Sequence, residues 1–314
     1  MSTRVVITEF LEPEAVEELK RRSFDVHWDR ELWTKRGDLE KLVKDLPGLI
    51  VRNRTRVDDA LLRLAPKLKV VGRLGVGLDN IDVAACERRG IEVCSARGAN
   101  ATSVSEYAIA MAMILLRGRA YRDTQRLVAG EWPREELGRG LELAGKTLGI
   151  IGLGSIGSTT ARKARALEMR VIATDPYLPA GNESWRLAQP AKLDDLLATS
   201  DVVTIHCPLT PQTRGMIAAA QLQRMRKGAI LINSARGGIV DEAACAAALR
   251  SGHLGGAALD VFDDEPIKAE AGKLFAGLSN VILTPHISGV TAEANHRVSY
   301  MTVDAVARVL QKGR

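Results

Sequence analysis

The chain has 314 residues, of which 46% are hydrophobic and 26% charged, a composition that is typical of a folded globular protein and excludes a disordered one. This length accommodates one large or two medium-sized domains. The 44 basic and 38 acidic residues leave a net charge of +6. Because the basic residues are scattered along the chain, we expect a solvated surface and no nucleic-acid partner.

Three further patterns bear on location. The longest apolar run, 108–116, is far shorter than the roughly 20 residues of a membrane span. The apolar run that starts at Val5 is broken at Thr8 and Glu9, which does not fit a signal peptide. The cysteines show neither a CxxC nor a zinc spacing; they are Cys86, Cys94, Cys207 and Cys245. We therefore expect a cytoplasmic protein with reduced thiols, no membrane partner and no metal site.

Short β-branched runs alternate with helical patterns in the first hundred residues. The predicted strands are 5–7, 49–51, 70–71 and 91–93. The predicted helices between them include 13–22 and 57–64. This alternation predicts a doubly wound α/β domain with a parallel sheet.

A long helix is expected next, over residues 103–128, and its apolar surface predicts burial. Residues 127–143 predict an irregular connection. A second series of strands follows, at 147–151, 170–174, 202–206, 229–233, 256–261 and 280–284, and a terminal helix is expected over 291–311. The sequence therefore predicts two α/β domains.

A glycine-rich turn follows the first strand of the second series. Gly152 would make a sharp turn, Gly154 would let the backbone approach a pyrophosphate, and Gly157 would let strand and helix pack closely, with the helix expected over 158–167. Asp175 follows the next strand, 18 residues beyond Gly157. An acid there accepts hydrogen bonds from a ribose and repels a 2′-phosphate, which favours NAD over NADP, although Asp175 also fits a simple turn before a proline.

The loops after three later strands carry groups suited to oxidising an alcohol. Arg236 lies in a glycine-flanked loop, Glu265 follows the next strand, and His286 follows the one after that. Taken singly, Arg236 and Glu265 fit ordinary surface charges, and His286 fits a packed core histidine. Because ligands of open α/β sheets bind at the carboxyl ends of the strands, the three together predict a site with a carboxylate-binding cation and an acid/base pair.

Seven segments together make the sequence resemble the D-isomer-specific 2-hydroxyacid dehydrogenase family over nearly its whole length. They are RLGVGLDNID (73–82), NATSVSEYA (100–108), GKTLGIIGLGSIG (145–157), HCPLTPQTRGMI (206–217), INSARGGIVDE (232–242), GAALDVFDDEP (256–266) and TPHISGVT (284–291). The resemblance implies two Rossmann-like domains, with an NAD-binding domain at 99–288 inserted in a substrate domain made of 1–98 and 289–314. It also implies a homodimer, with the helix after Asn100 in the interface.

The resemblance also implies roles for individual residues. Arg236 would hold the substrate, His286 would be the acid/base and Glu265 its partner. Backbone amides of Val76 and Gly77 would bind the substrate carboxylate from the other domain, so that closure would assemble the site. The residues expected to contact NAD are Gly152, Gly154, Ser155, Ile156, Gly157, Asp175, His206, Pro208, Thr213, Ala235, Asp260 and Gly289. For His206, a purely structural role is an equal alternative.

Three features bear on the substrate. Glu265 favours a true hydroxyacid, because the formate-oxidising branch carries glutamine there, and Asp175 disfavours the NADP-preferring glyoxylate and hydroxypyruvate reductases. The stretch containing Arg52 and Arg54 is similar to one in 3-phosphoglycerate dehydrogenases. This similarity implies that Arg52 or Arg54 would bind a second anionic group on the substrate, as in 3-phosphoglycerate or sulfolactate. The alternative is that both arginines face water. The regulatory domains of many phosphoglycerate dehydrogenases are not expected here.

Two alternatives remain open. One is a glyoxylate or hydroxypyruvate reductase. The other is an NAD-sensing interaction protein, like the C-terminal-binding corepressors that share this fold.

Overall fold

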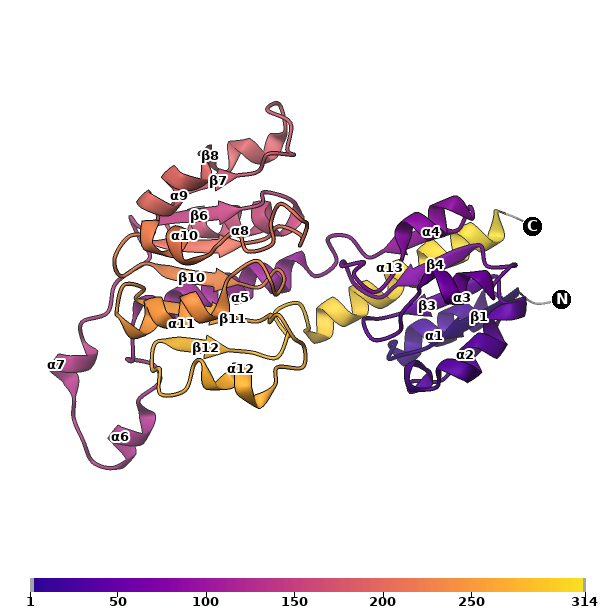
Figure 1. Ribbon diagram of the computed structural model, residues 1–314, viewed down its shortest axis with the longest axis horizontal. Coiled ribbons are helices and arrows are strands. Elements are labelled where there is room, and N and C mark those ends of the chain that lie inside the picture. The colour runs from indigo at the N-terminus through magenta and orange to yellow at the C-terminus, as the bar shows by residue number, and fades with distance from the viewer. Residues whose placement is uncertain (1–2, 313–314) are drawn as a thin grey trace. The chain divides into compact units, whose positions relative to one another are not determined.

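The computed structural model describes residues 3–312 and divides the chain into two compact units (Figure 1). One unit combines the residues up to Asn100 with those from Val290 onward, and the other comprises Ala101–Gly289. Each is built on a parallel sheet with helices on both faces, so the predicted fold of two Rossmann-like α/β domains is confirmed.

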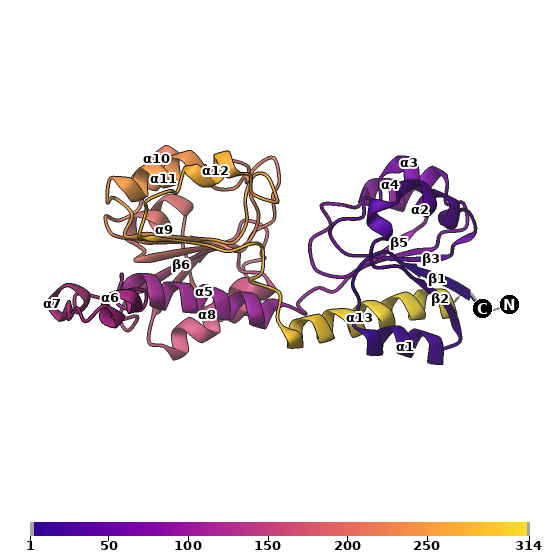
Figure 2. The ribbon, with the colours of Figure 1, turned by 90° about the horizontal axis from the view of Figure 1, so that it is seen from below.

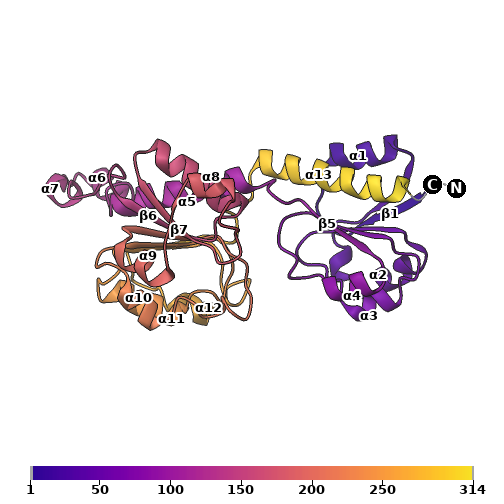
Figure 3. The same cartoon turned by 90° about the horizontal axis from the view of Figure 1, so that it is seen from above.

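The first unit holds a five-stranded sheet in the order β2-β1-β3-β4-β5. Its strands are β1 (Thr3–Ile7), β2 (Phe24–Trp28), β3 (Gly48–Val51), β4 (Val70–Arg73) and β5 (Glu92–Ser95). Its α-helices are α1 (Pro13–Arg21), α2 (Arg36–Leu42), α3 (Asp59–Arg63), α4 (Val83–Arg88) and α13 (Ala292–Gln311), with 3₁₀ turns η1 (Leu32–Thr34) and η2 (Val43–Asp45). Helices α1 and α13 cover one face of the sheet, and α2, α3 and α4 cover the other (Figures 2 and 3).

The second unit holds a seven-stranded sheet in the order β12-β11-β10-β9-β6-β7-β8. Its strands are β6 (Thr147–Ile151), β7 (Arg170–Thr174), β8 (Gln189–Pro190), β9 (Val202–Ile205), β10 (Ile230–Asn233), β11 (Gly256–Leu259) and β12 (Val281–Leu283). Its helices are α5 (Ala101–Leu116), α6 (Thr124–Val128), α7 (Arg134–Leu137), α8 (Ser155–Ala166), α9 (Leu193–Thr199), α10 (Ala219–Arg224), α11 (Glu242–Arg250) and α12 (Ala269–Lys273), with a 3₁₀ turn η3 (Glu183–Arg186). The order changes direction between β6 and β9, and this switch point is where such sheets bind ligands.

Alternate residues of the central strands face opposite layers, which gives each unit a core on both sides of its sheet. In β1, Val6 packs under α2 and α3, whereas Val5 and Ile7 pack under α1 and α13, and all three are fully buried. Each such side chain contributes about 1.5–3 kcal/mol when it leaves water. These cores fix the strand ends from which the site loops emerge.

Two expected helices differ from the structure. The helix predicted over 103–128 is α5, which ends at Leu116 because Gly118 adopts a left-handed φ of 62°; α6 is a separate short helix. The helix predicted to begin at Ser158 begins at Ser155, inside the glycine turn itself. No helix among residues 3–312 is long and apolar enough to cross a membrane.

Candidate active site

The glycine turn after β6 has the shape that a dinucleotide requires. Gly152 adopts a φ of 93°, and a Cβ on it would lie 2.9 Å from the backbone of His206. A Cβ on Gly157 would overlap the carbonyl oxygen of Gly152, so only glycine lets the helix start this close to the strand. A Cβ on Gly154 would meet nothing within 4 Å, which leaves open space in front of the turn.

Helix α8 presents its first amides to that open space. Gly154 is its N-cap and has no side chain to cap the helix, so the amides of Ser155 and Ile156 are available to an anion. Asp175 stabilises the turn from the end of β7, because its carboxylate accepts a hydrogen bond from the amide of Leu153 (2.9 Å). The residues present therefore fit a bound pyrophosphate, and binding of the ribose by Asp175 stays a prediction.

His206 follows β9 and faces the same turn. Its Nε2 lies 3.1 Å from the Thr204 hydroxyl and 3.4 Å from that of Thr160, while Nδ1 is buried without a partner among the described residues. Burial lowers the pKa of His206 to about 3, so the ring is neutral. An unpaired buried nitrogen beside the nucleotide turn is consistent with either role that the sequence allows, and its contact with NAD stays a prediction.

Arg236 is held by the backbone of its loop after β10. The Asn233 side chain donates to the Arg236 carbonyl (2.9 Å) and accepts from the Ala235 amide (3.1 Å), which folds the loop back on the strand end. A Cβ on the adjacent Gly237 would overlap the carbonyl of Phe262, so this loop packs directly against the loop that carries Glu265. The Arg236 side chain is half-buried there.

Glu265 and His286 form an ion pair in which His286 Nδ1 lies 2.6 Å from Glu265 Oε2. Burial would raise the pKa of Glu265, but the hydrogen bond and charge of His286, together with a backbone amide and the charge of Arg236, hold it below its ordinary value. The contribution of this carboxylate to stability is thus present above its unfolded pKa and is lost as the pH falls through the folded value. An ionised carboxylate only accepts, so Nδ1 carries the proton and Nε2 is left for other partners.

The loop that carries His286 is anchored by Asp260, which is fully buried. Its carboxylate accepts hydrogen bonds from the Thr284 hydroxyl (2.6 Å) and from the amides of Ile287 and Ser288 (2.8 Å each). His286 itself has a left-handed φ of 55°, and its amide donates to the Asp260 carbonyl (2.9 Å). Such strained backbone persists only where its surroundings hold it, and Asp260 supplies that support.

Other predicted cofactor contacts lie around the same strand ends. Thr213 is engaged in its own turn, since its hydroxyl donates to the Pro208 carbonyl (2.7 Å) and accepts from the Thr210 amide (2.7 Å). Ala235 is buried behind Arg236, and Gly289 is half-buried beyond the His286 loop. The second unit thus gathers the predicted triad and the predicted nucleotide residues at the carboxyl ends of its strands.

The predicted substrate residues of the first unit follow β3 and β4. Val76 and Gly77 are half-buried beyond β4, and Arg52 and Arg54 lie in the loop after β3. Glu9, which the sequence reasoning missed, organises this loop: its buried carboxylate accepts from the amides of Arg52 (2.9 Å), Arg54 (3.1 Å) and Thr55 (3.0 Å). An acidic residue two positions after a buried strand is the signal in the sequence.

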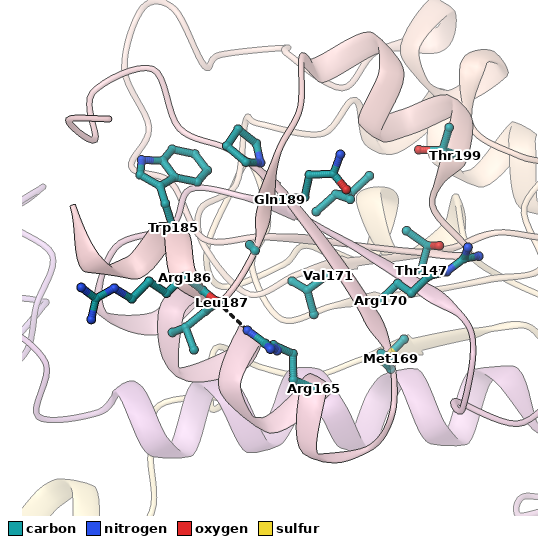
Figure 4. A pocket seen from close by; sticks show the side chains of 13 residues that line it. Thr147, Arg165, Met169, Arg170, Val171, Trp185, Arg186, Leu187, Gln189 and Thr199 are labelled. Carbon is teal, nitrogen blue, oxygen red and sulfur yellow. Dashed lines mark hydrogen bonds between the residues drawn. The ribbon is translucent and has the colours of Figure 1, made fainter. Parts of the chain in front are cut away.

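A depression elsewhere on the second unit does not belong to this site. Its volume is about 610 Å³, and it is lined at the amino ends of β6 and β7 by residues that include Thr147, Arg165 and Trp185 (Figure 4). Nucleotides bind at the opposite ends of such strands. Within residues 3–312, no three His, Cys, Asp or Glu side chains gather as a metal site would require.

Comparisons with known proteins agree with this geometry. The family model described as "D-isomer specific 2-hydroxyacid dehydrogenase, NAD binding domain" matches residues 109–288. The chain is 48% identical to a (S)-sulfolactate dehydrogenase of Chromohalobacter salexigens over 98% of both chains. It is 37% identical to a D-3-phosphoglycerate dehydrogenase of Archaeoglobus fulgidus over 98% of its own length but 57% of the relative's.

A solved structure matches as well. The D-lactate dehydrogenase of Aquifex aeolicus in complex with NAD and lactic acid superposes with a TM-score of 0.84 at 29% identity, covering 98% of this chain and 96% of that one. The site contains a glycine turn, an acid after β7 and a histidine–carboxylate pair. The chain that carries them belongs to the D-isomer-specific 2-hydroxyacid dehydrogenase family and is an NAD-dependent 2-hydroxyacid dehydrogenase.

Proposed function

We propose that the substrate is a small 2-hydroxyacid with a second anionic group, and that Arg236, His286 and Glu265 carry out its oxidation. The observation that carries the catalytic part is the 2.6 Å pair of His286 and Glu265 with the charge of Arg236 beside it. A guanidinium binds a carboxylate through two parallel hydrogen bonds, which orients the neighbouring carbon. An imidazole whose Nδ1–H is fixed by a carboxylate presents Nε2 to the substrate oxygen.

His286 moves the proton in either direction. In reduction, its protonated Nε2 donates to the 2-keto oxygen; in oxidation, the neutral ring accepts the hydroxyl proton. Glu265 holds the ring orientation and stabilises the imidazolium. Bound NAD supplies or accepts the hydride. The backbone amides of Val76 and Gly77 bind the substrate carboxylate.

The cofactor is held by the residues predicted for it. Ser155 and Ile156 bind the pyrophosphate through their backbone amides, and Asp175 binds the ribose while it also holds the Leu153 amide. The carboxylate of Asp175 repels a 2′-phosphate, so NAD is preferred over NADP. His206, Pro208, Thr213, Ala235, Asp260 and Gly289 complete the proposed cofactor site.

The second anion is assigned to Arg52 and Arg54. The Glu9 carboxylate fixes their loop through three backbone amides, so both guanidinium groups start from a rigid backbone. The relatives at 48% and 37% identity are called after substrates with a second anionic group, sulfolactate and 3-phosphoglycerate. This supports a sulfonate or a phosphate in addition to the carboxylate.

The test is a panel of 2-hydroxyacids assayed with NAD and NADP by NADH or NADPH absorbance. We expect turnover of a doubly anionic substrate with NAD, and His286→Ala is expected to lose about 100-fold or more in kcat. His27→Ala removes an exposed histidine of β2 and is the matched control. Arg236→Ala is expected to lose rate on lactate as well, whereas Arg52→Ala raises KM chiefly for doubly anionic substrates. No turnover, or a strong preference for NADP, refutes the proposal.

We also propose a homodimer formed through the segment around α6 and α7, which extends away from the sheet of its unit (Figure 1). Large apolar side chains are exposed there: Tyr121, Leu127, Val128, Trp132 and Leu141, with Trp132 79% exposed. Large exposed apolar side chains concentrated in one segment are typical of a protein–protein interface. Light scattering is expected to give a dimer for the wild type and a monomer for Trp132→Asp; a monomeric wild type refutes it.

A cytoplasmic location is proposed from the cysteines, all four of which are free thiols. We propose neither a membrane nor a nucleic acid as a partner. Recovery of the protein with membranes after cell fractionation, or its retention on DNA at physiological salt, would contradict this.

A further inference from the structure

Three arginines lie at the carboxyl edge of the first unit's sheet, each beside an aromatic ring. The guanidinium carbon of Arg30, which follows β2, lies 4.9 Å from the ring centre of Phe10. That of Arg52, which follows β3, lies 5.6 Å from the same ring. Arg54 lies 4.6 Å from the ring of Trp33. Loops after β1, β2 and β3 thus bring two guanidinium groups to one phenylalanine.

The Phe10 platform is fixed by its neighbours. Trp28 closes β2, and its Nε1 donates to the Glu9 carbonyl (2.9 Å), which ties the end of β2 to the loop that carries Phe10. Arg30 also lies 5.9 Å from the Trp28 ring centre. Asn295 orients Arg52 from α13, where its oxygen accepts from Nη2 (3.3 Å).

Rings hold these guanidinium groups without consuming their N–H donors. In the described part of the chain, no carboxylate oxygen lies within 4.0 Å of Arg30, Arg52 or Arg54, whereas the surface arginine Arg36 is paired with two acids and Arg126 with three. Arg52 Nη2 is shared with Asn295, but none of the three guanidinium groups has a carboxylate partner there, and positioned donors without an acidic partner are what an incoming anion requires.

Charges of both signs surround Arg52. Burial lowers the pKa of Arg52, an effect that Glu9 and Glu12 oppose and Arg54 reinforces. Glu9 does not bond these guanidinium groups, because its oxygens accept from the backbone of the Arg52 loop and from the Thr55 hydroxyl (2.8 Å). A bound anion would offset the cost of keeping Arg52 half-buried.

We propose that Arg30 is a specificity-determining residue, and that Arg30 and Arg52 over Phe10 together bind a tetrahedral oxyanion, a sulfonate or a phosphate, on the substrate. This rests on the assignment of Arg52 to the second anion made above. A carboxylate has one two-oxygen edge and satisfies one guanidinium fork, whereas a group with three terminal oxygens has an edge for each of two forks. The pair therefore selects a tetrahedral anion over a second carboxylate.

The kinetic test compares Arg30→Gln with Arg88→Gln, which removes an exposed arginine at the end of α4. We expect Arg30→Gln to raise KM about tenfold for 3-sulfolactate or 3-phosphoglycerate, whichever the wild type oxidises, with kcat changed less than twofold. KM for malate and lactate stays within twofold. Arg88→Gln changes none of these values. Equal effects on all substrates, or no effect on the tetrahedral ones, overturn the proposal.

A binding test separates this proposal from the catalytic one, because it needs no turnover. The probes are 3-sulfopropionate, 3-phosphonopropionate and succinate, followed by calorimetry and by tryptophan fluorescence. The wild type is expected to bind one of the first two at least fivefold more tightly than succinate, which also distinguishes sulfonate from phosphate. Arg30→Gln and Phe10→Leu are expected to abolish that preference. The inference is overturned by equal binding of all three probes, by no binding of any, or by a preference that persists in Arg30→Gln. This holds even if the hydroxyacid activity is present. A preference that is lost in Arg30→Gln supports the inference, even if that activity is absent.

Discussion

Replacing Asp260 by asparagine tests whether the buried carboxylate positions the loop that carries His286, the proposed acid/base. The substitution keeps the shape of the side chain but turns one acceptor oxygen into a donor and removes the charge. Oδ1 accepts hydrogen bonds from the Thr284 hydroxyl and the Ile287 amide, and Oδ2 accepts one from the Ser288 amide. An asparagine satisfies the first pair with its oxygen and leaves the Ser288 amide facing an NH₂ group.

The expected cost follows from these contacts. A hydrogen bond to a charged acceptor is worth about 1.5–3 kcal/mol, and a buried donor left unpaired costs about 1–3 kcal/mol. Because Asp260 is fully buried, solvent does not replace the lost partner. We expect the free energy of opening the loop to fall by about 3 kcal/mol, which is roughly a hundredfold in the opening equilibrium.

Hydrogen exchange of the Ile287 and Ser288 amides measures this directly. In Asp260→Asn we expect exchange at Ser288 to accelerate roughly a hundredfold, and kcat to fall because His286 leaves its position. Asp263→Asn, an exposed neighbour, is the control and leaves both values unchanged. Unchanged exchange at Ser288 in Asp260→Asn would refute the argument that this carboxylate holds the loop.

Three further outcomes are expected in the second unit. Glu265→Gln is expected to lower kcat about 10- to 100-fold, because an amide does not stabilise the imidazolium of His286. The control Asp264→Asn is expected to leave kcat unchanged. Equal steady-state rates of the two variants would contradict this. Asp175→Ala is expected to raise the NADPH-to-NADH ratio of kcat/KM at least tenfold, and an unchanged ratio would remove Asp175 from ribose selection. Gly157→Ala is expected to abolish NAD binding in calorimetry, since its Cβ overlaps a backbone oxygen; wild-type affinity would contradict the tight turn.

The sequence predicts the central strands well, because buried parallel strands are continuous apolar runs. It misses β2, whose outward residues Asp25 and His27 interrupt the run at the edge of the sheet. It also places the start of α8 three residues late, since a glycine N-cap has no side chain to mark the beginning of a helix. Local pattern alone decides neither case.

The residues expected to do chemistry follow from strand ends and motif spacing, but the contacts that hold them do not. Asp260 binds amides 27 and 28 residues away, and Glu9 binds the amide of Arg52, 43 residues away. Arg30 lies in no motif and is placed beside Phe10 by the pairing of β1 with β2. These contacts form only through tertiary packing, so no local sequence pattern indicates them.

The division of the first unit between two distant stretches of chain has a consequence for synthesis on the ribosome. Helix α13 is part of that unit's core: Val306 and Leu310 pack in the cluster under β1 and β4, and a Cβ on Gly48 would lie 2.8 Å from Leu310. The second unit is complete at Gly289, before α13 is made. The nascent chain is therefore expected to fold its middle first and to finish its beginning last, and protease protection of ribosome-stalled chains would reveal that order.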